Sequence, residues 1–283
     1  SHSQAADAPP PEAPAPAPAT PTDGISPGVK AEPVDSGPAE PDEGAIASLS
    51  PTAWLNYVVN SRIDLLELFA GSQHLSQASS DRGIATGVPV DLRTGFDLTT
   101  TEGQNKAWKA IHQQQPHVVW MAIPCSPYSC LLNAQKDWYR RQKIREAKPL
   151  LDFCIKVAWY QISHDRKFVI ENPQSSQLWH QAQIKELCLV EGVTWDTLDM
   201  CQFGLRDPVS GEFYHKSTSL MHNFEPGVLD PIFKRCYDDH PHVRIQGRNE
   251  QGTNHSVQAQ VYPKRFCNLI SSLLSKYLSL IHI

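Results

Sequence analysis

The chain has 283 residues, of which 40% are hydrophobic, and 25 Lys and Arg residues against 30 Asp and Glu residues give a net charge of −5. This length suffices for one domain with a sizeable hydrophobic core. The sequence contains no apolar run long enough to span a bilayer and no signal-peptide pattern. We therefore expect no membrane association.

Composition divides the chain near residue 51. Residues 1–51 hold 12 of the 23 prolines, eight acidic residues and one lysine. Such a segment cannot bury enough apolar surface to offset the entropy of ordering, so we predict a disordered, acidic Pro/Ala-rich tail. Residues 52–283 then form the folded domain, with 24 basic and 22 acidic residues. This small positive balance permits nucleic-acid binding without arguing for it.

Apolar runs alternate with helical patterns through the first part of this domain. We predict strands at 63–69, 84–90, 116–123 and 168–170. Helices are expected at 72–80, 101–112, 131–163 (two helices meeting near Pro149) and 174–190. This alternation is typical of an α/β fold with a doubly wound, mostly parallel sheet.

The alternation of strand and helix patterns ends near residue 194. Segments 194–200 and 217–222 are expected to form an antiparallel pair around a turn at 207–211. Residues 269–283 have the pattern of an amphipathic C-terminal helix. The seven cysteines are an odd number without disulfide-framework spacing. They predict reduced thiols in an intracellular protein, nuclear if the source is eukaryotic.

Two predicted strands end in side chains that can do chemistry. Pro124-Cys125 follows the strand at 116–123, and Glu171-Asn172-Pro173 follows the strand at 168–170. Ligands of open α/β sheets bind at the carboxyl ends of the strands. A cysteine nucleophile with a nearby acid suits covalent attack on an electron-poor ring that is protonated as it is attacked. The alternatives are a small buried hydrophobe for Cys125 and a structural salt bridge for Glu171.

A cofactor site is predicted at the first strand. The turn Phe69-Ala70-Gly71 allows a ligand to approach the backbone, and Asp91 lies 20 residues further, where a carboxylate binds ribose hydroxyls. The G-x-G-x-x-G fingerprint is incomplete, which favours S-adenosylmethionine over a dinucleotide. Asp97 either reaches an adenine amino group or caps the helix near Thr101. An ordinary strand-turn-helix remains the alternative.

In this order the motifs resemble the DNA cytosine-5 methyltransferase family, over roughly residues 63–206. The resembling segments are Leu68-Phe69-Ala70-Gly71, Asp91, Pro124-Cys125-Ser126-Pro127-Tyr128-Ser129, Glu171-Asn172-Pro173 and Gln202-Phe203-Gly204-Leu205-Arg206. The last resembles Gln-x-Arg-x-Arg, with Gly204 in place of the first arginine. The resemblance implies a Rossmann-like class I methyltransferase fold. It assigns the cofactor S-adenosylmethionine to Phe69, Ala70, Gly71, Asp91, Asp97 and Pro124.

The resemblance also implies a mechanism. Cys125 would add to C6 of cytosine, Glu171 would hold N3 and the exocyclic amine, and C5 would then take the methyl group. Arg206 would hold the cytosine O2 within the motif that begins at Gln202. The alternative for Gln202 and Arg206 is a pair of polar residues that line a turn. We expect Arg206 or the helix starting near Ser129 to favour the thiolate. DNA is the expected partner. RNA as the substrate, or a catalytically inactive binding module, are the alternatives.

The segment 207–262 is short. Only 55 residues separate Arg206 from Tyr262, where the family has a sizeable target-recognition domain. The chain therefore resembles a shortened, divergent member, and target recognition would need another module or partner.

A metal site is a further hypothesis for this segment. The spacing Cys236-x3-His240-x-His242 offers three zinc ligands, with Cys201, His222 or His255 as a possible fourth. A solvated loop with incidental histidines is the alternative. Zinc would brace an insertion too short for its own core.

Overall fold

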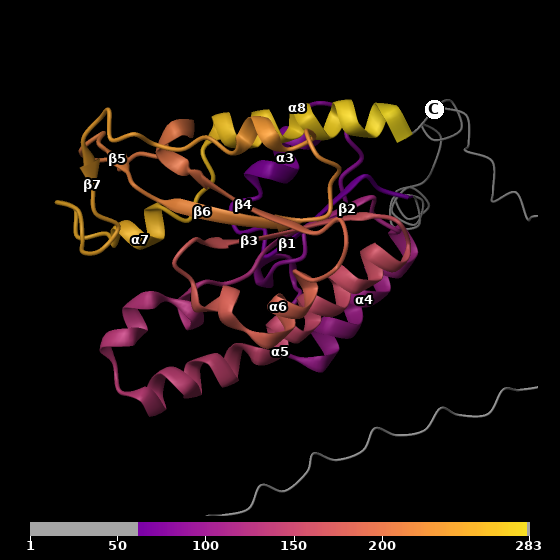
Figure 1. The fold of residues 1–283 in the computed structure, drawn as a ribbon, viewed down its shortest axis with the longest axis horizontal. Helices are drawn as coiled ribbons and strands as arrows, with labels where there is room; N and C mark the ends of the chain where they lie inside the picture. The colour runs from indigo at the N-terminus through magenta and orange to yellow at the C-terminus, as the bar shows by residue number, and fades with distance from the viewer. Residues whose placement is uncertain (1–61, 282–283) are drawn as a thin grey trace, which may run out of the picture. The chain divides into compact units, whose positions relative to one another are not determined.

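The computed structural model describes residues 62–281, and the predicted tail at 1–51 lies outside them (Figure 1). The centre is a five-stranded sheet in the order β1-β2-β3-β6-β4. Its strands are β1 (Leu65–Leu68), β2 (Val118–Ala122), β3 (Lys167–Pro173), β4 (Thr194–Asp199) and β6 (Ser217–His222). The first three are parallel, and β6 is antiparallel to both of its neighbours. Four of the five strands thus run in one direction, which confirms the mostly parallel α/β sheet.

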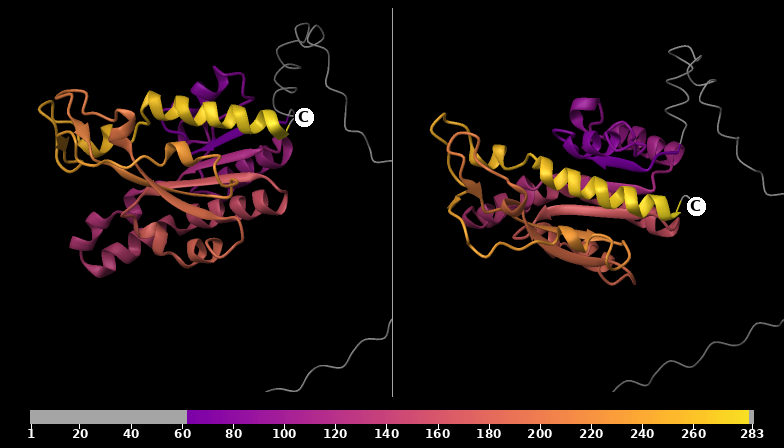
Figure 2. Two further views of the ribbon diagram at one scale, coloured as in Figure 1. Left: turned by 45° about the horizontal axis from the view of Figure 1, so that its top comes forward. Right: turned by 90° about the horizontal axis from the view of Figure 1, so that it is seen from above.

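Helices cover both faces of the sheet (Figures 1 and 2). One face carries α4 (Thr101–Gln114), α5 (Asp137–Ser163) and α6 (Ala182–Leu187), and the other carries α3 (His74–Ser80) and α8 (Lys264–Ile281). Strand side chains alternate between the two hydrophobic cores, as the period of two requires. Val119 and Met121 join the core under α4 and α5, while Val118 and Trp120 join the core under α3 and α8. The result is a three-layer α/β/α domain.

The end of the chain packs on the beginning of the described part. Helix α8 lies along α3, and the hydroxyls of Ser79 and Ser271 are 3.0 Å apart across their contact. Because α8 is amphipathic, its apolar residues fill the second core: Phe266, Ile270, Leu274 and Leu278 are buried. The predicted amphipathic C-terminal helix is therefore present, beginning at Lys264.

Three predicted elements differ from the structure. The strand expected at 84–90 contributes only isolated bridges, Thr86 to Leu65 and Val90 to Leu68, because Pro89 lacks an amide hydrogen for a continuous ladder. The helices expected to meet near Pro149 are one continuous helix, α5, whose buried face past the proline is anchored in the core. The helix expected at 174–190 is a 3₁₀ turn (Gln177–His180) followed by α6.

The short segment 207–262 carries little regular structure. It contains β5 (Phe213–Tyr214) and β7 (His242–Val243), which pair in parallel, the sheet strand β6, and α7 (His255–Gln258). The predicted antiparallel pair of 194–200 with 217–222 is confirmed as β4 and β6. Within residues 62–281, none of the helices combines the length and the apolar character needed to cross a membrane.

Candidate active site

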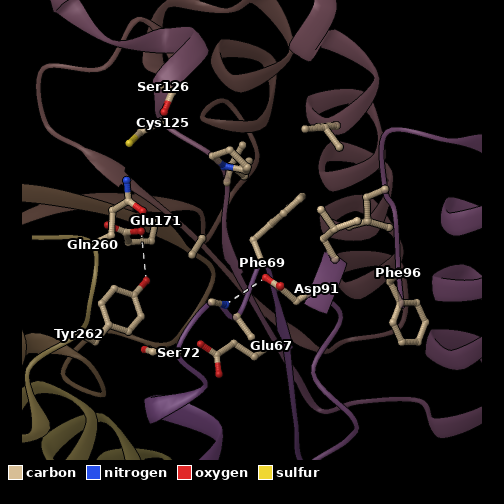
Figure 3. Close-up of a pocket in the computed structure, with 18 of the residues that line it drawn as sticks. Glu67, Phe69, Ser72, Asp91, Phe96, Cys125, Ser126, Glu171, Gln260 and Tyr262 are labelled. Atoms are coloured by element: carbon tan, nitrogen blue, oxygen red, sulfur yellow. Dashed lines mark hydrogen bonds between the residues drawn. The ribbon is translucent and has the colours of Figure 1, made fainter. Parts of the chain in front are cut away.

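A cavity of about 390 Å³ opens at the carboxyl ends of β1, β2 and β3 (Figure 3). Its volume lies in the range of roughly 300–1,000 Å³ that is usual for small-molecule sites. Its walls come from the turn after β1, residues 91–99, the loop after β2, the end of β3, and the connection from α7 to α8. The lining includes eight residues singled out from the sequence: Phe69, Ala70, Gly71, Asp91, Asp97, Pro124, Cys125 and Glu171.

Strand pairing brings Cys125 and Glu171 to one side of this cavity. β2 and β3 are in register with Ala122 beside Glu171, so the loop to Cys125 starts next to the glutamate. The following residue, Asn172, faces the other way and donates its Nδ2 to the carbonyl of Ile123 at 2.6 Å. This bond holds the loop after β2 against the end of β3. Glu171 thus faces the cavity, while Asn172 fixes the cavity wall.

Glu171 is 6% exposed, and one of its two carboxylate oxygens has a hydrogen-bond partner among the described residues. Its Oε2 accepts a hydrogen bond from the Tyr262 hydroxyl at 3.1 Å, and that hydroxyl accepts one from Trp120 Nε1 at 3.2 Å. Its Oε1 has no hydrogen-bond partner among the described residues. A buried acceptor left without a partner costs about 1–3 kcal/mol, so this oxygen is suited to a donor on a ligand.

The surroundings of Cys125 favour the neutral thiol. Burial raises the pKa of the Cys125 thiol, and Glu171 adds to the rise, while Lys216 opposes it. Lys216 lines the cavity from the residue before β6, and its carbonyl accepts the Met200 amide at 2.9 Å. Lys216 is therefore the cation available to a thiolate, in the place where the sequence suggested Arg206. No local motif marks it, because β6 brings it to the site from 91 residues beyond the thiol.

The opposite end of the cavity is formed by an unusual turn. Phe69 has φ of 59° and Gly71 has φ of 52°. Positive φ is strained for a bulky side chain, and such strain concentrates at ligand sites. The Asp91 carboxylate accepts the Gly71 amide through Oδ2 and the Arg93 amide through Oδ1, each at 3.0 Å. Asp91 thus fixes the turn while remaining part of the cavity wall, which Figure 3 shows beside Phe69.

Asp97 lines the same end without capping α4. Its Oδ1 accepts the Thr99 amide at 3.0 Å, and Thr99 holds the pKa of this carboxyl below its usual range. The cap of α4 is Thr100, which accepts the Gly103 amide at 3.0 Å. A Cβ on Gly103 would lie 2.0 Å from the Asp97 carbonyl oxygen, so α4 needs glycine there.

Sequence reasoning missed Glu67, a second buried acid in the cavity wall. Desolvation raises the pKa of Glu67 to about 7, although its Oε2 accepts both the amide and the hydroxyl of Ser76. The available signal was an acidic residue inside the apolar run of β1, at a position that the period of two turns toward α3.

Gln202 and Arg206 are not among the residues that line the cavity. The Arg206 guanidinium lies 3.7 Å from the centre of the Phe213 ring and donates to the Gly211 carbonyl at 3.0 Å. Gln202 belongs to the 3₁₀ turn Met200–Phe203 that follows β4. The structure therefore does not bring these two residues together with Cys125.

The three predicted metal ligands converge at a second place. Cys236, His240 and His242 lie with Cys201 so that their ligand atoms are all within 4.8 Å of one another. The other two candidates for the fourth position have different partners: His222 stacks on Phe233, and His255 is hydrogen-bonded to the Tyr214 hydroxyl at 2.8 Å. None of the four clustered residues belongs to the cavity lining described above.

No protein-family model and no curated protein sequence matches this chain. Among solved structures, it resembles the Dnmt2 methyltransferase of S. pombe at 12% identity and a TM-score of 0.37, covering 66% of this chain and 59% of that one. It also resembles a DNMT2 mutant from Spodoptera frugiperda at 11% identity and a TM-score of 0.33, covering 64% and 54%. The chain thus spans less than two thirds of either protein. Similarity of this size assigns no family.

Proposed function

We propose that this chain is an S-adenosylmethionine-dependent methyltransferase that methylates C5 of cytosine in DNA through a covalent bond to Cys125. One observation carries the proposal. Cys125 and Glu171, at the ends of neighbouring parallel strands, line a single cavity together with Phe69, Gly71 and Asp91.

The cofactor end suits S-adenosylmethionine. The Phe69 ring offers a surface for adenine, the Asp91 carboxylate has lone pairs left for ribose hydroxyls, and the Gly71 turn gives access to the backbone. When bound, S-adenosylmethionine supplies a methyl group on a positively charged sulfur. Pro124 lines the same cavity and would be a further contact of the cofactor.

The cysteine end suits a pyrimidine. Cys125 loses its proton as its sulfur bonds to C6, and Lys216 stabilises the thiolate on the way. The proton that the thiol gives up would reach cytosine N3 through Glu171, and Glu171 Oε1 would accept a hydrogen bond from the exocyclic amine, which gives this oxygen a partner. The electron pair of the C5–C6 double bond would then form the bond from C5 to the methyl group. The bond between that methyl group and the cofactor sulfur would break at the same time, and its electron pair would stay on the departing thioether. Water would take the C5 proton, and the C5–C6 double bond would re-form as the sulfur–C6 bond breaks. The sulfur would regain its proton from N3 by way of Glu171, which returns the thiol.

The target base must enter the cavity out of its stack, which costs a few kcal/mol in a duplex and less in a single strand. Segment 207–262 offers β5, β7 and α7 in place of a large base-reading domain. We therefore expect little sequence preference from this chain alone, with another module or partner supplying target recognition.

Two measurements test the proposal on the full chain. Calorimetric titration with S-adenosylmethionine should give a saturable, micromolar-range interaction. Transfer of a labelled methyl group should then occur to cytosine-containing single-stranded DNA, with duplex DNA and single-stranded RNA as parallel arms. Transfer to RNA but not to DNA would move the substrate to RNA. Binding without transfer to any arm would favour an inactive binding module, and no binding would contradict the proposal.

A matched control comes from the same loop. Cys130 is an exposed thiol five residues after Cys125 and outside the cavity lining. Cys130→Ser should leave methyl transfer unchanged. A chain inactivated by that substitution alone would show that the assay reports general thiol damage.

A further inference from the structure

The second site of this molecule is the cluster of Cys201, Cys236, His240 and His242, hereafter the Cys/His cluster. Cys201 is 2% exposed in the 3₁₀ turn after β4, Cys236 and His240 lie in the loop that leads into β7, and His242 is the first residue of β7. Each residue offers one ligand atom, and all four atoms lie within 4.8 Å of one another. Two separate segments of the chain therefore converge on one point.

The separations within the cluster fit a tetrahedral metal. The Cys236 sulfur lies 3.8 Å from His240 Nε2 and 3.6 Å from His242 Nε2. Bonds of about 2.3 Å to sulfur and about 2.0–2.1 Å to nitrogen at a tetrahedral angle would place these atoms roughly 3.6 Å apart. These two sulfur–nitrogen separations thus already match the edges of a coordination tetrahedron, and the remaining ligand atoms lie within 4.8 Å.

Both imidazoles are oriented by carboxylates on their far side. His240 Nδ1 lies 2.7 Å from Asp239 Oδ1, and His242 Nδ1 lies 3.6 Å from Asp238 Oδ1. Carboxylates behind metal-binding histidines fix the ring and raise its basicity. The Asp238 amide donates to the Cys236 sulfur at 3.4 Å, which supports negative charge on that sulfur. These contacts direct both Nε2 atoms to the same sulfur, an arrangement that a solvated loop does not require.

We propose that the Cys/His cluster binds one Zn²⁺ as a closed, structural site. Two sulfur and two imidazole ligands select zinc among the common divalent ions, and four protein ligands leave no open position for a substrate. The site is therefore distinct from the cavity and is not catalytic.

The position of the cluster shows what the metal would hold. Asp199, at the end of β4, accepts the Cys236 amide at 2.8 Å and Arg235 Nε at 2.9 Å through Oδ2. Zinc would add a second link between the end of β4 and the loop, through Cys201. Met200 lies between these two links, and its amide is bonded to the Lys216 carbonyl. The metal thus braces the segment that presents Lys216 to the cavity and that is too short for a core of its own.

The test uses the full chain purified without added chelator. Elemental analysis should find about one zinc per chain, and Co²⁺ exchanged into the site should give the visible absorption of tetrahedral thiolate coordination. Cys236→Ser and His242→Ala should reduce the zinc content to near zero. The controls Cys188→Ser and His180→Asn, outside the cluster, should retain it.

A measurement on the unchanged sequence covers the case in which a variant does not fold. Chelation should lower the melting temperature by roughly 10 °C, and zinc should restore it. Background zinc content with no cobalt spectrum would overturn the proposal. A melting temperature unchanged by chelation, equal zinc in Cys236→Ser and Cys188→Ser, or a Cys201–Cys236 disulfide found by mass spectrometry would each do the same.

Discussion

The two ends of the cavity are held by different kinds of contact. At the cofactor end, the Phe69–Gly71 turn is fixed by Asp91, 20 residues from Gly71, through hydrogen bonds to backbone amides. At the cysteine end, Glu171 is held by Tyr262, which lies 91 residues further along the sequence. The Cys125 thiol interacts with Lys216, which is also 91 residues further along the sequence. The first end is local and backbone-built, while the second depends on side chains assembled by the complete fold. Substitutions at the two ends should therefore affect different steps.

Cys125→Ala is expected to give the largest difference between the effect on methyl transfer and the effect on cofactor binding. Removing the nucleophile should lower methyl transfer by roughly 10³-fold or more, since the covalent route is lost. The dissociation constant for S-adenosylmethionine should stay within about twofold, because that ligand is held at the other end. Labelled-methyl assays and calorimetry measure the two quantities on the same preparation. Retained transfer would remove Cys125 from the mechanism.

Glu67 provides a pH test at the cofactor end. Because its pKa is raised to about 7 in the folded chain, the folded state binds more protons than the unfolded state between about pH 4.5 and 7. This group's contribution to the unfolding free energy is therefore greatest below pH 4.5 and falls as pH rises through 7, by up to about 3 kcal/mol. Glu67→Gln keeps an acceptor for Ser76 and should remove this dependence. Parallel pH profiles of urea unfolding for the two chains would contradict the assignment.

Asp91→Ala should act on cofactor binding. It removes the acceptor of two amides, which is also the carboxylate that we propose binds ribose, so we expect S-adenosylmethionine to bind roughly 10–100-fold more weakly. Calorimetry measures the change. Asp81→Ala, at an exposed position after α3, is the control. Equal affinities for the two variants would show that Asp91 only shapes the turn.

The smallest effect is expected from Tyr262→Phe at the cysteine end. The change leaves Glu171 Oε2 and Trp120 Nε1 without their shared partner, so kcat should fall roughly 3–10-fold. Tyr277→Phe, on α8 and outside the cavity lining, should leave kcat unchanged. A loss of cofactor affinity with unchanged kcat would place Tyr262 with the other end of the cavity.

The local end was predictable from sequence because its residues follow one another along the chain. The turn at 69–71 and the acid after the next apolar run were both found in this way. The loop at 124–125 and the acid at 171 were also visible, since each follows a buried strand. The sequence did not predict three further residues of the cavity wall: Lys216 near the thiol, Tyr262 beside Glu171, and Glu67 near the turn at 69–71. Their positions depend on strand pairing and burial, which no local pattern reveals.

The errors have similar physical origins. Arg206 was expected beside the thiol from its motif, but the left-handed turn at Gly204 (φ 85°) precedes it and its side chain packs on Phe213. Pro149 was expected to divide a helix, but burial of the apolar face of α5 outweighs the lost hydrogen bond. The sequence spacing alone predicted Cys236, His240 and His242 as ligands. The structure was needed to identify Cys201, rather than His222 or His255, as the fourth residue of the cluster.

Covalent trapping tests the convergence of Cys125 and Glu171 most directly. A DNA oligonucleotide with 5-fluorocytosine blocks the final elimination, since fluorine cannot leave C5 as a proton does. With S-adenosylmethionine present, we predict a stable protein–DNA adduct that peptide mass spectrometry locates on Cys125 and that Glu171→Gln strongly reduces. An adduct that persists in Cys125→Ala, or one mapped to another cysteine of the wild-type chain, would contradict this mechanism.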